Sequence, residues 1–361
     1  MGVDAQYRDV VSKPDFFAAL GARYPVIQAP MAGFGDAGLA IAAIRGGGIG
    51  SLAGAMFAPD RLLTEVATVR ASVVGPLNLN FFCHQPPQDV DDSAWRALLA
   101  PLYAAEGITP GGDAPPARRP FDGDAAHVVE ETRPDIVSFH FGLPAPDLLA
   151  RVRATGARII ASATNVAEAR HLAKAGCDAI IAQGYEAGGH AGHFLHGHRP
   201  VGTFALVPQI ADAVDVPVIA AGGIADARGA AAAIVLGATG VQAGSAYLST
   251  EESLASAIHR AALAGPEAGD SVFTNLFSGG LARGIRNRLI DTLGAINPTV
   301  PPFPTASAAL APLRKHAESA GRGDYTSLWA GQAAPLSHYR HAAALTEMLG
   351  AAALAARRSL A

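Results

Sequence analysis

The chain has 361 residues, of which 50% are apolar, 6% aromatic and 16% charged, a composition typical of a folded globular protein. Its formal net charge of −4 argues against nucleic acid as a partner, because phosphate backbones attract clustered Lys and Arg. Two cysteines, Cys83 and Cys177, are too few for a disulfide framework or a thiolate metal site.

The segment from Met1 to Val11 lacks the apolar core of a secretory leader. Residues Gly229 to Leu248 carry no charge, but they contain four glycines and Gln242. This stretch is therefore more typical of a buried helix followed by a strand than of a membrane span. We expect a soluble, cytoplasmic protein without a membrane segment.

Short apolar runs alternate with Ala-rich helical segments along most of the chain. The runs are nearly continuous in apolar character rather than alternating, as expected of strands that are buried on both faces. The predicted strands are Val26–Pro30, Ile49–Leu52, Leu77–Phe82, Ile136–Phe141, Arg158–Ser162, Ala179–Gln183, Val218–Ala221 and Gly240–Gly244. The predicted helices between them include Ala37–Arg45, Pro59–Ala71, Asp147–Thr155, Val166–Ala175, Phe204–Val214 and Asp226–Leu236.

Eight strand–helix units over about 240 residues match the size and rhythm of a (β/α)8 TIM barrel of the α/β class. A doubly wound open sheet is the alternative. We expect the barrel to span residues 1–262, with an insertion at about 84–124 that contains a helix around Ser93–Ala104. Residues 263–361 are expected to form a mainly helical extension that covers the barrel mouth, where catalytic loops gather.

Glycines follow the last two predicted strands, at the end of the barrel where ligands bind. Gly222 and Gly223 come directly after the seventh strand, and Gln242-Ala243-Gly244-Ser245 ends the eighth. Glycine lets the backbone approach a ligand closely, and turn N–H groups favour an anion. The two loops together predict a phosphate site, and simple capping of the strands is the alternative.

Histidines follow two other strands. The sixth strand leads into Gln183 and then into a glycine-rich loop in which Gly188 precedes His190. The titration range of a histidine in this position suits proton transfer. His140 ends the fourth strand and is either a pocket residue or a hydrogen-bonded core residue. The further histidines at positions 193, 196 and 198 allow a metal cluster, but we expect none because no Cys or carboxylate joins the run.

Neutral amides accompany these groups. Asn80 lies nearer the barrel mouth than Asn78 on the third strand and offers both a donor and an acceptor to a planar heterocycle. After the first strand, Pro30 lacks an N–H, which leaves the N–H of Met31 available to a ligand edge. A phosphate site combined with Asn80, Gln183 and Gln242 favours flavin mononucleotide (FMN) over a sugar phosphate as the ligand.

Several short segments of the chain form a familiar set: Gln28–Met31, Asn80–Phe82, Ser138–Gly142, Gln183–Gly192, Gly222–Gly223, Gln242–Ser245, Ala282–Asn287 and Leu328–Gln332. Together they resemble the nitronate monooxygenase (2-nitropropane dioxygenase) family, class I. The likeness extends from about residue 24 to 335. The Glu-Ala-Gly-Gly-His signature alone is shared with a flavin enoyl reductase of fatty-acid synthesis. The Ser-Phe-His-Phe-Gly and Trp-Ala-Gly-Gln stretches favour class I.

The resemblance implies a role for each candidate residue. His190 would be the active-site base or anion stabiliser, and His140 would be a second histidine of the substrate pocket. The residues that would contact the FMN ring or hold its phosphate are Pro30, Met31, Asn80, Gln183, Gly188, Gly222, Gly223, Gln242, Ala243, Gly244 and Ser245.

The reaction implied by the resemblance uses FMN and O2. It oxidises an alkyl nitronate, or a nitroalkane, to a carbonyl compound and nitrite through a flavin semiquinone. An NAD(P)H-dependent flavin reductase, acting on an enoyl thioester or a quinone, is the alternative enzyme. A non-enzymatic phosphate-binding regulator is a third reading. A monomer or a homodimer is expected.

Overall fold

The computed structural model describes residues 15–111, 118–195, 197–338 and 340–360. The Met1–Val11 segment, on which the leader prediction depended, lies outside these ranges, as does His196 of the histidine-rich loop.

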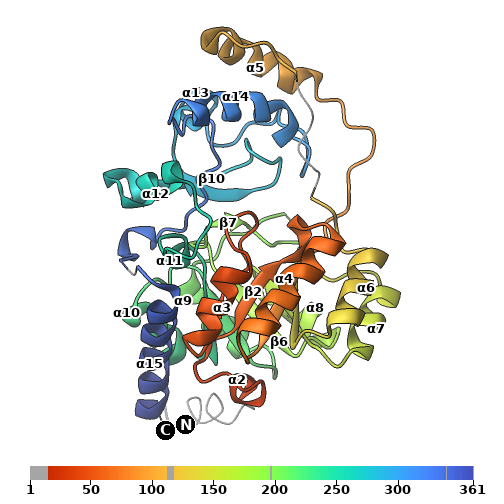
Figure 1. Cartoon of the computed structure of the whole chain (residues 1–361), viewed down its shortest axis with the longest axis vertical. Helices are drawn as coiled ribbons and strands as arrows, with labels where there is room; N and C mark the ends of the chain where they lie inside the picture. Colours follow the sequence, from red (N-terminus) through yellow and green to blue (C-terminus); the bar gives the residue numbers. More distant parts are fainter. Residues whose placement is uncertain (1–14, 112–117, 196, 339, 361) are drawn as a thin grey trace.

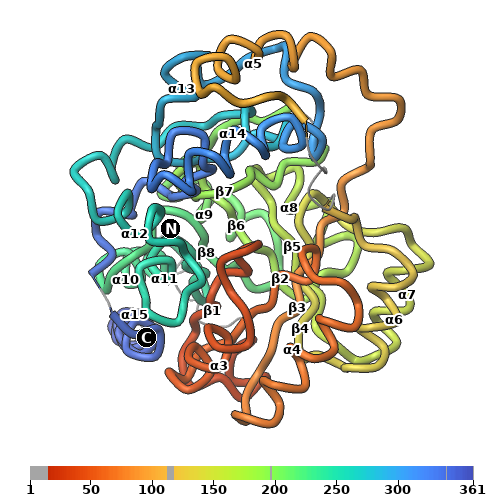
Figure 2. Tube along the Cα trace, turned by 45° about the horizontal axis from the view of Figure 1, so that its top comes forward, coloured from red at the N-terminus to blue at the C-terminus, as the bar shows by residue number. Residues whose placement is uncertain are grey.

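Eight parallel strands form a barrel, which confirms the predicted fold (Figures 1 and 2). The strand order is β1-β9-β8-β6-β5-β4-β3-β2, and a bridge between Ile27 and Ile49 joins the two ends of this order. The strands are β1 (Val26–Gln28), β2 (Gly50–Ala53), β3 (Leu77–Phe82), β4 (Ile136–His140), β5 (Arg158–Ala163), β6 (Ala179–Gln183), β8 (Val218–Ala221) and β9 (Gly240–Ala243). Each agrees with a predicted strand to within two residues at either end.

Helices surround the barrel and bury the outer faces of its strands. They are α3 (Ala37–Arg45), α4 (Pro59–Ser72), α6 (Gly123–Thr132), α7 (Pro146–Ala154), α8 (Val166–Lys174), α9 (Thr203–Ala211) and α10 (Ala227–Val235). Several of them begin at a side chain that accepts a hydrogen bond from the first helical turn, as Asp36, Asn165 and Asp226 do. The six predicted helices are therefore present with small shifts at their ends.

The short helix α2 (Phe16–Ala19) lies at the lower end of the barrel in Figure 1. Its Phe17 belongs to one buried cluster with isoleucines of several strands, among them Ile136, Ile160 and Ile219. This packing fills the end of the barrel at which the strands begin. The opposite end, where the strands finish, is left for loops and a cavity.

The insertion and the C-terminal part of the chain form a common layer above that opposite end (Figures 1 and 2). Helix α5 (Ser93–Glu106) packs with α13 (Arg288–Leu293) and α14 (Ser307–Ser319) around Trp95 and Leu313. The Glu106 carboxylate also accepts hydrogen bonds from Arg288 and Arg322. Segments about 200 residues apart in sequence are thus joined by apolar and ionic contacts.

A small antiparallel sheet, which the sequence did not predict, lies between this layer and the barrel. Its strand order is β10 (Ser271–Thr274), β11 (Ala282–Ile285) and β7 (Gly189–His190). Strand β7 belongs to the loop after β6, so the sheet connects that loop to the C-terminal part of the chain. The remaining short elements are η1 (Gly54–Met56), α11 (Ser245–Leu248), α12 (Ala257–Ala264), η2 (Pro266–Gly269) and η3 (Ala334–Leu336).

The last helix, α15 (Ala342–Leu360), runs along the outside of the barrel beside α10 and α3 (Figure 1). It buries Leu345 and Leu349 there. The described part of the chain after residue 262 therefore contains β10 and β11 as well as helices in two places, and the division of the protein at residue 262 stays a prediction. No helix within the described ranges is long and apolar enough to cross a membrane.

Candidate active site

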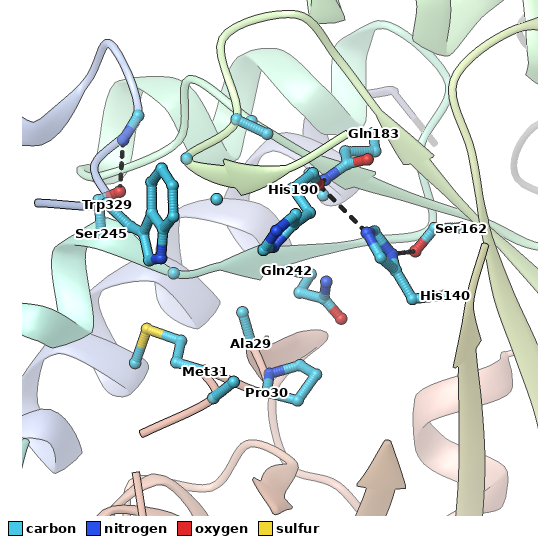
Figure 3. A pocket seen from close by; sticks show the side chains of 18 of the residues that line it. Ala29, Pro30, Met31, His140, Ser162, Gln183, His190, Gln242, Ser245 and Trp329 are labelled. Carbon is cyan, nitrogen blue, oxygen red and sulfur yellow. Dashed lines mark hydrogen bonds between the residues drawn. The ribbon is translucent and has the colours of Figure 1, made fainter. Parts of the chain in front are cut away.

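A cavity opens at the ends of the barrel strands, under the loop that carries Trp329 (Figure 3). Almost all of the candidate residues from the sequence line it. They are Pro30, Met31, Asn80, His140, Gln183, Gly188, His190, Gly222, Gly223, Gln242, Gly244 and Ser245. Ala243 is the exception, because it is buried within β9 and does not line the cavity.

His190 belongs to β7 and pairs with Ala282 of β11. Its Nε2 lies 2.8 Å from the Ser278 hydroxyl oxygen, which in turn lies 3.3 Å from the carbonyl oxygen of Gly280. When the Ser278 hydroxyl donates to that carbonyl, it accepts from His190, so the imidazole carries its proton on Nε2. Nδ1 has no hydrogen-bond partner among the described residues.

The His190 imidazole is uncharged in this environment. Burial holds its pKa well below the usual value, and the positive charge of Arg118 lowers it further. A neutral ring with its lone pair on an unpartnered nitrogen is the form that accepts a proton. The site therefore contains one group that can act as a base toward a bound molecule.

His140 and Gln183 hold the backbone of His190 in place (Figure 3). The His140 Nε2 lies 3.1 Å from the His190 carbonyl oxygen, and its Nδ1 lies 3.1 Å from the Ser162 hydroxyl oxygen. Gln183 donates to the same carbonyl at 2.9 Å and accepts from the N–H of Gly192 at 2.7 Å. The geometry therefore gives His140 and Gln183 a positioning role in addition to a place in the cavity wall.

The buried, neutral histidines of the protein are expected to lower its stability toward unfolding in mild acid. Burial lowers the pKa of His140, and also that of His259, to about 4. Unfolded histidines bind protons near pH 6.5, so between pH 6.5 and 4 the unfolded state binds more protons than the folded state. We expect the free energy of unfolding to fall by about 3 kcal/mol per histidine as the pH drops through this window.

Urea denaturation between pH 7.5 and 4.5 measures this loss. His259 is fully buried, and its Nε2 donates to the Trp329 carbonyl oxygen at 3.0 Å. The His259→Gln variant keeps a neutral donor and is expected to flatten the profile. An unchanged profile in that variant would show that the titration of His259 does not contribute.

The loop from the C-terminal part of the chain forms one wall of the cavity. The Trp329 ring centroid lies 5.6 Å from that of His190, and the N–H of Gly331 donates to the Ser245 hydroxyl at 2.8 Å (Figure 3). Ser245 follows β9, so this hydrogen bond fixes the loop to the barrel end. Trp329 was noted in the sequence as part of a likeness but was not predicted as a site residue.

Polar groups without partners show what kind of ligand the cavity fits. The Gln242 Oε1 is buried and has no hydrogen-bond partner among the described residues. Gly222 and Gly223 adopt φ angles of +106° and +72°, and the described part of the chain provides no acceptor for the N–H groups of Gly223 and Ser245. These groups fit a molecule with a hydrogen-bonding planar edge and an anionic end.

Two other histidines of the predicted His-rich loop, His193 and His198, do not line this cavity. His193 and His198 line a second cavity together with His84 and Cys83. Burial raises the pKa of the Cys83 thiol. Within the described ranges, no group of three or more His, Cys, Asp or Glu side chains is arranged to hold a metal ion.

Several residues of the site escaped the sequence analysis. Ser162 and Phe82 could have been found, because both end predicted strands, and Phe82 was part of a quoted stretch. Ser278, which contacts His190, and Arg118, which lines the cavity, could not be assigned in this way. Ser278 and Arg118 come from irregular segments with no periodic pattern, and only tertiary packing brings them to the site.

Comparison with known proteins shows the family to which the chain belongs. The family model for nitronate monooxygenase matches residues 14–350. A nitronate monooxygenase of Pseudomonas aeruginosa is 39% identical over 341 residues, which cover 92% of this chain and 97% of the relative. A second, from Paraburkholderia phytofirmans, is 40% identical over 350 residues, which cover 94% and 95% of the two chains.

Comparison with solved structures finds the same fold in related enzymes. A nitroalkane oxidase from Streptomyces ansochromogenes superposes with a TM-score of 0.85 at 34% identity, covering 96% of this chain and 99% of its own. FabK from Thermotoga maritima has a TM-score of 0.72 at 27% identity, with 95% and 97% of the chains covered. The chain therefore belongs to the nitronate monooxygenase family, and it is a flavin-dependent oxidoreductase.

Proposed function

We propose that this enzyme binds FMN in the cavity and uses O2 to oxidise alkyl nitronates to a carbonyl compound and nitrite. Neutral nitroalkanes are substrates after His190 removes a proton. The observation that carries the proposal is the His190 Nδ1, which has no hydrogen-bond partner among the described residues, in the same cavity as unsatisfied groups that fit a flavin phosphate and ring. A cytoplasmic location and a monomeric or homodimeric state belong to the proposal as predictions.

The residues of the cavity fit FMN. The unsatisfied Gln242 Oε1 suits an N–H or hydroxyl donor of the flavin, and the N–H groups after β8 and β9 suit its phosphate. The Asn80 Nδ2 donates to the Ser138 hydroxyl at 2.9 Å, which orients its carbonyl oxygen. Bound FMN supplies the redox chemistry, because it exchanges electrons with the substrate and with O2.

The chain itself supplies the proton chemistry. The His190 Nδ1 takes the proton from the carbon that bears the nitro group of a neutral nitroalkane. Ser278 holds the opposite N–H, and this hydrogen bond strengthens as the ring becomes positively charged. His140 and Gln183 fix the His190 backbone, so the ring stays in position during proton transfer. A preformed nitronate needs no such step.

An anaerobic absorbance titration of the purified holoenzyme tests the proposed function. A nitronate is added to one cuvette and NADH to another. We expect the nitronate to bleach the visible flavin absorbance and NADH to leave it unchanged, with nitrite released when air is admitted. Rapid bleaching by NADH would instead support the NAD(P)H-dependent flavin reductase. A colourless protein that takes up no FMN would contradict the cofactor assignment.

A further inference from the structure

A cationic side chain from the insertion lies in the wall of the active-site cavity. Arg118 lines the cavity together with Phe82 and His190. Its guanidinium carbon lies 5.7 Å from the centroid of the Phe303 ring, and the His190 ring lies 5.0 Å from the same centroid. The N–H of Phe121 donates to the Phe82 carbonyl at 2.7 Å, so the segment after Arg118 is attached to the end of β3.

Arg118 has no anionic partner in the described ranges. None of the ion pairs there includes its side chain, and its Nε is buried without a hydrogen-bond acceptor. Its neighbour Arg119, in contrast, pairs with Asp122 and Asp124 at the surface. A guanidinium keeps its charge in proteins, and an unpaired charge that is shielded from water is costly. An anionic ligand would remove this cost.

The position of Arg118 indicates which anion it meets. The proposed phosphate turns follow β8 and β9, whereas Phe82 ends β3. In the closed strand order, β3 lies diametrically opposite β8. The guanidinium is therefore on the opposite side of the barrel from the phosphate turns and on the same side as the proposed base.

We propose that Arg118 binds the planar, negatively charged nitro group of the nitronate and thereby makes the active site select this anion over the neutral nitroalkane. The inference rests on the proposed function and adds to it a substrate-binding residue. A nitronate has two oxygens in one plane, as a carboxylate does, and a guanidinium donates to such a pair through two parallel N–H groups.

Bound nitronate also changes the environment of His190. The charge of Arg118 lowers the pKa of the His190 imidazole, second only to burial. An anion paired with Arg118 cancels that effect, so the imidazole accepts a proton more readily when a nitronate is bound than when the cavity holds only water.

Steady-state kinetics of three variants test the role of Arg118. Arg118→Met removes the charge and keeps an unbranched side chain. We expect it to raise the KM for the nitronate about 100-fold or more, the effect of losing two charge-assisted hydrogen bonds. The KM for the neutral nitroalkane and the FMN content are expected to stay within about twofold of wild type. Arg118→Lys keeps the charge without the planar fork and should give an intermediate KM.

Arg119→Met is the matched control, because it changes the adjacent arginine, which is exposed and already paired. It is expected to leave both KM values unchanged. A wild-type enzyme that does not turn over any nitronate would contradict the proposed function. A wild-type enzyme that does so, with an unchanged nitronate KM in Arg118→Met, would overturn the role of Arg118 alone.

Binding of inorganic nitrate gives a readout that is independent of turnover. Nitrate is a planar monoanion with two oxygens on each edge, and its affinity for the oxidised holoenzyme is measured by isothermal titration calorimetry. We expect Arg118→Met to lose at least about tenfold in affinity and Arg119→Met to lose none. Equal affinities in the two variants would overturn the proposal. If Arg118→Met does not fold, Arg118→Lys tests the same proposal, because we expect it to bind nitrate more weakly than wild type.

Discussion

Replacing His190 with asparagine is expected to lower kcat/KM for a neutral nitroalkane about 10²- to 10⁴-fold, the usual contribution of a general base. The same variant should lose less than about tenfold on the preformed nitronate, whose carbon is already deprotonated. Asparagine offers no nitrogen lone pair to the substrate, and it is too short to replace the Nε2 that contacts Ser278. Oxygen consumption with each form of the substrate measures the two values.

The control for this variant is His171→Asn, because it makes the same substitution at an exposed histidine on α8. It should not change either rate. FMN content, taken from the ratio of visible to ultraviolet absorbance, shows whether the cofactor is retained in both variants. Equal losses on nitroalkane and nitronate would reject the role of His190 as a base and would leave it a role in binding or in stabilising charge.

The barrel could be predicted from the sequence because its strands are buried on both faces. Runs such as Ala179–Gln183 and Val218–Ala221 are nearly continuous in apolar character, and the helices between the strands have clear ends. The small sheet gives no comparable signal. Gly189 and His190 form a strand of only two residues, and their partners Arg283 and Ala282 lie about 90 positions away in the chain.

The site could be predicted only as far as the barrel rule extends. His140 and Gln183 end strands, Asn80 lies two residues before the end of β3, and the ends of barrel strands meet at the mouth. Ser278 and Arg118 come from segments outside the barrel repeat, so neither spacing nor composition places them beside His190. The hydrogen bonds of His140 and Gln183 to the His190 backbone depend in the same way on a loop whose path the sequence does not determine.

Valine in place of Gly223 is expected to weaken FMN binding about 100-fold or more. Gly223 adopts a φ of +72°, a conformation that strains a β-branched residue, so the turn must rearrange and move its N–H groups. Each charge-assisted hydrogen bond to a phosphate is worth about 1.5–3 kcal/mol, so the loss of two accounts for the expected change. Fluorescence of the flavin released on dilution measures the affinity.

Gly321→Val is the control that separates the loss of FMN binding from the cost of backbone strain. Gly321 has nearly the same φ, +73°, at an exposed position after α14. Both substitutions impose a similar conformational cost of about 1–2 kcal/mol on the folded protein. Neither creates a severe clash, since a Cβ at Gly223 would lie 3.5 Å from its nearest neighbour, in Glu186, and one at Gly321 would have none within 4 Å.

The two variants should therefore unfold at similar urea concentrations without FMN. Only Gly223→Val should release bound FMN. Equal FMN affinity in both would mean that the phosphate binds elsewhere in the cavity, and the turns after β8 and β9 would then need another ligand to explain their free N–H groups.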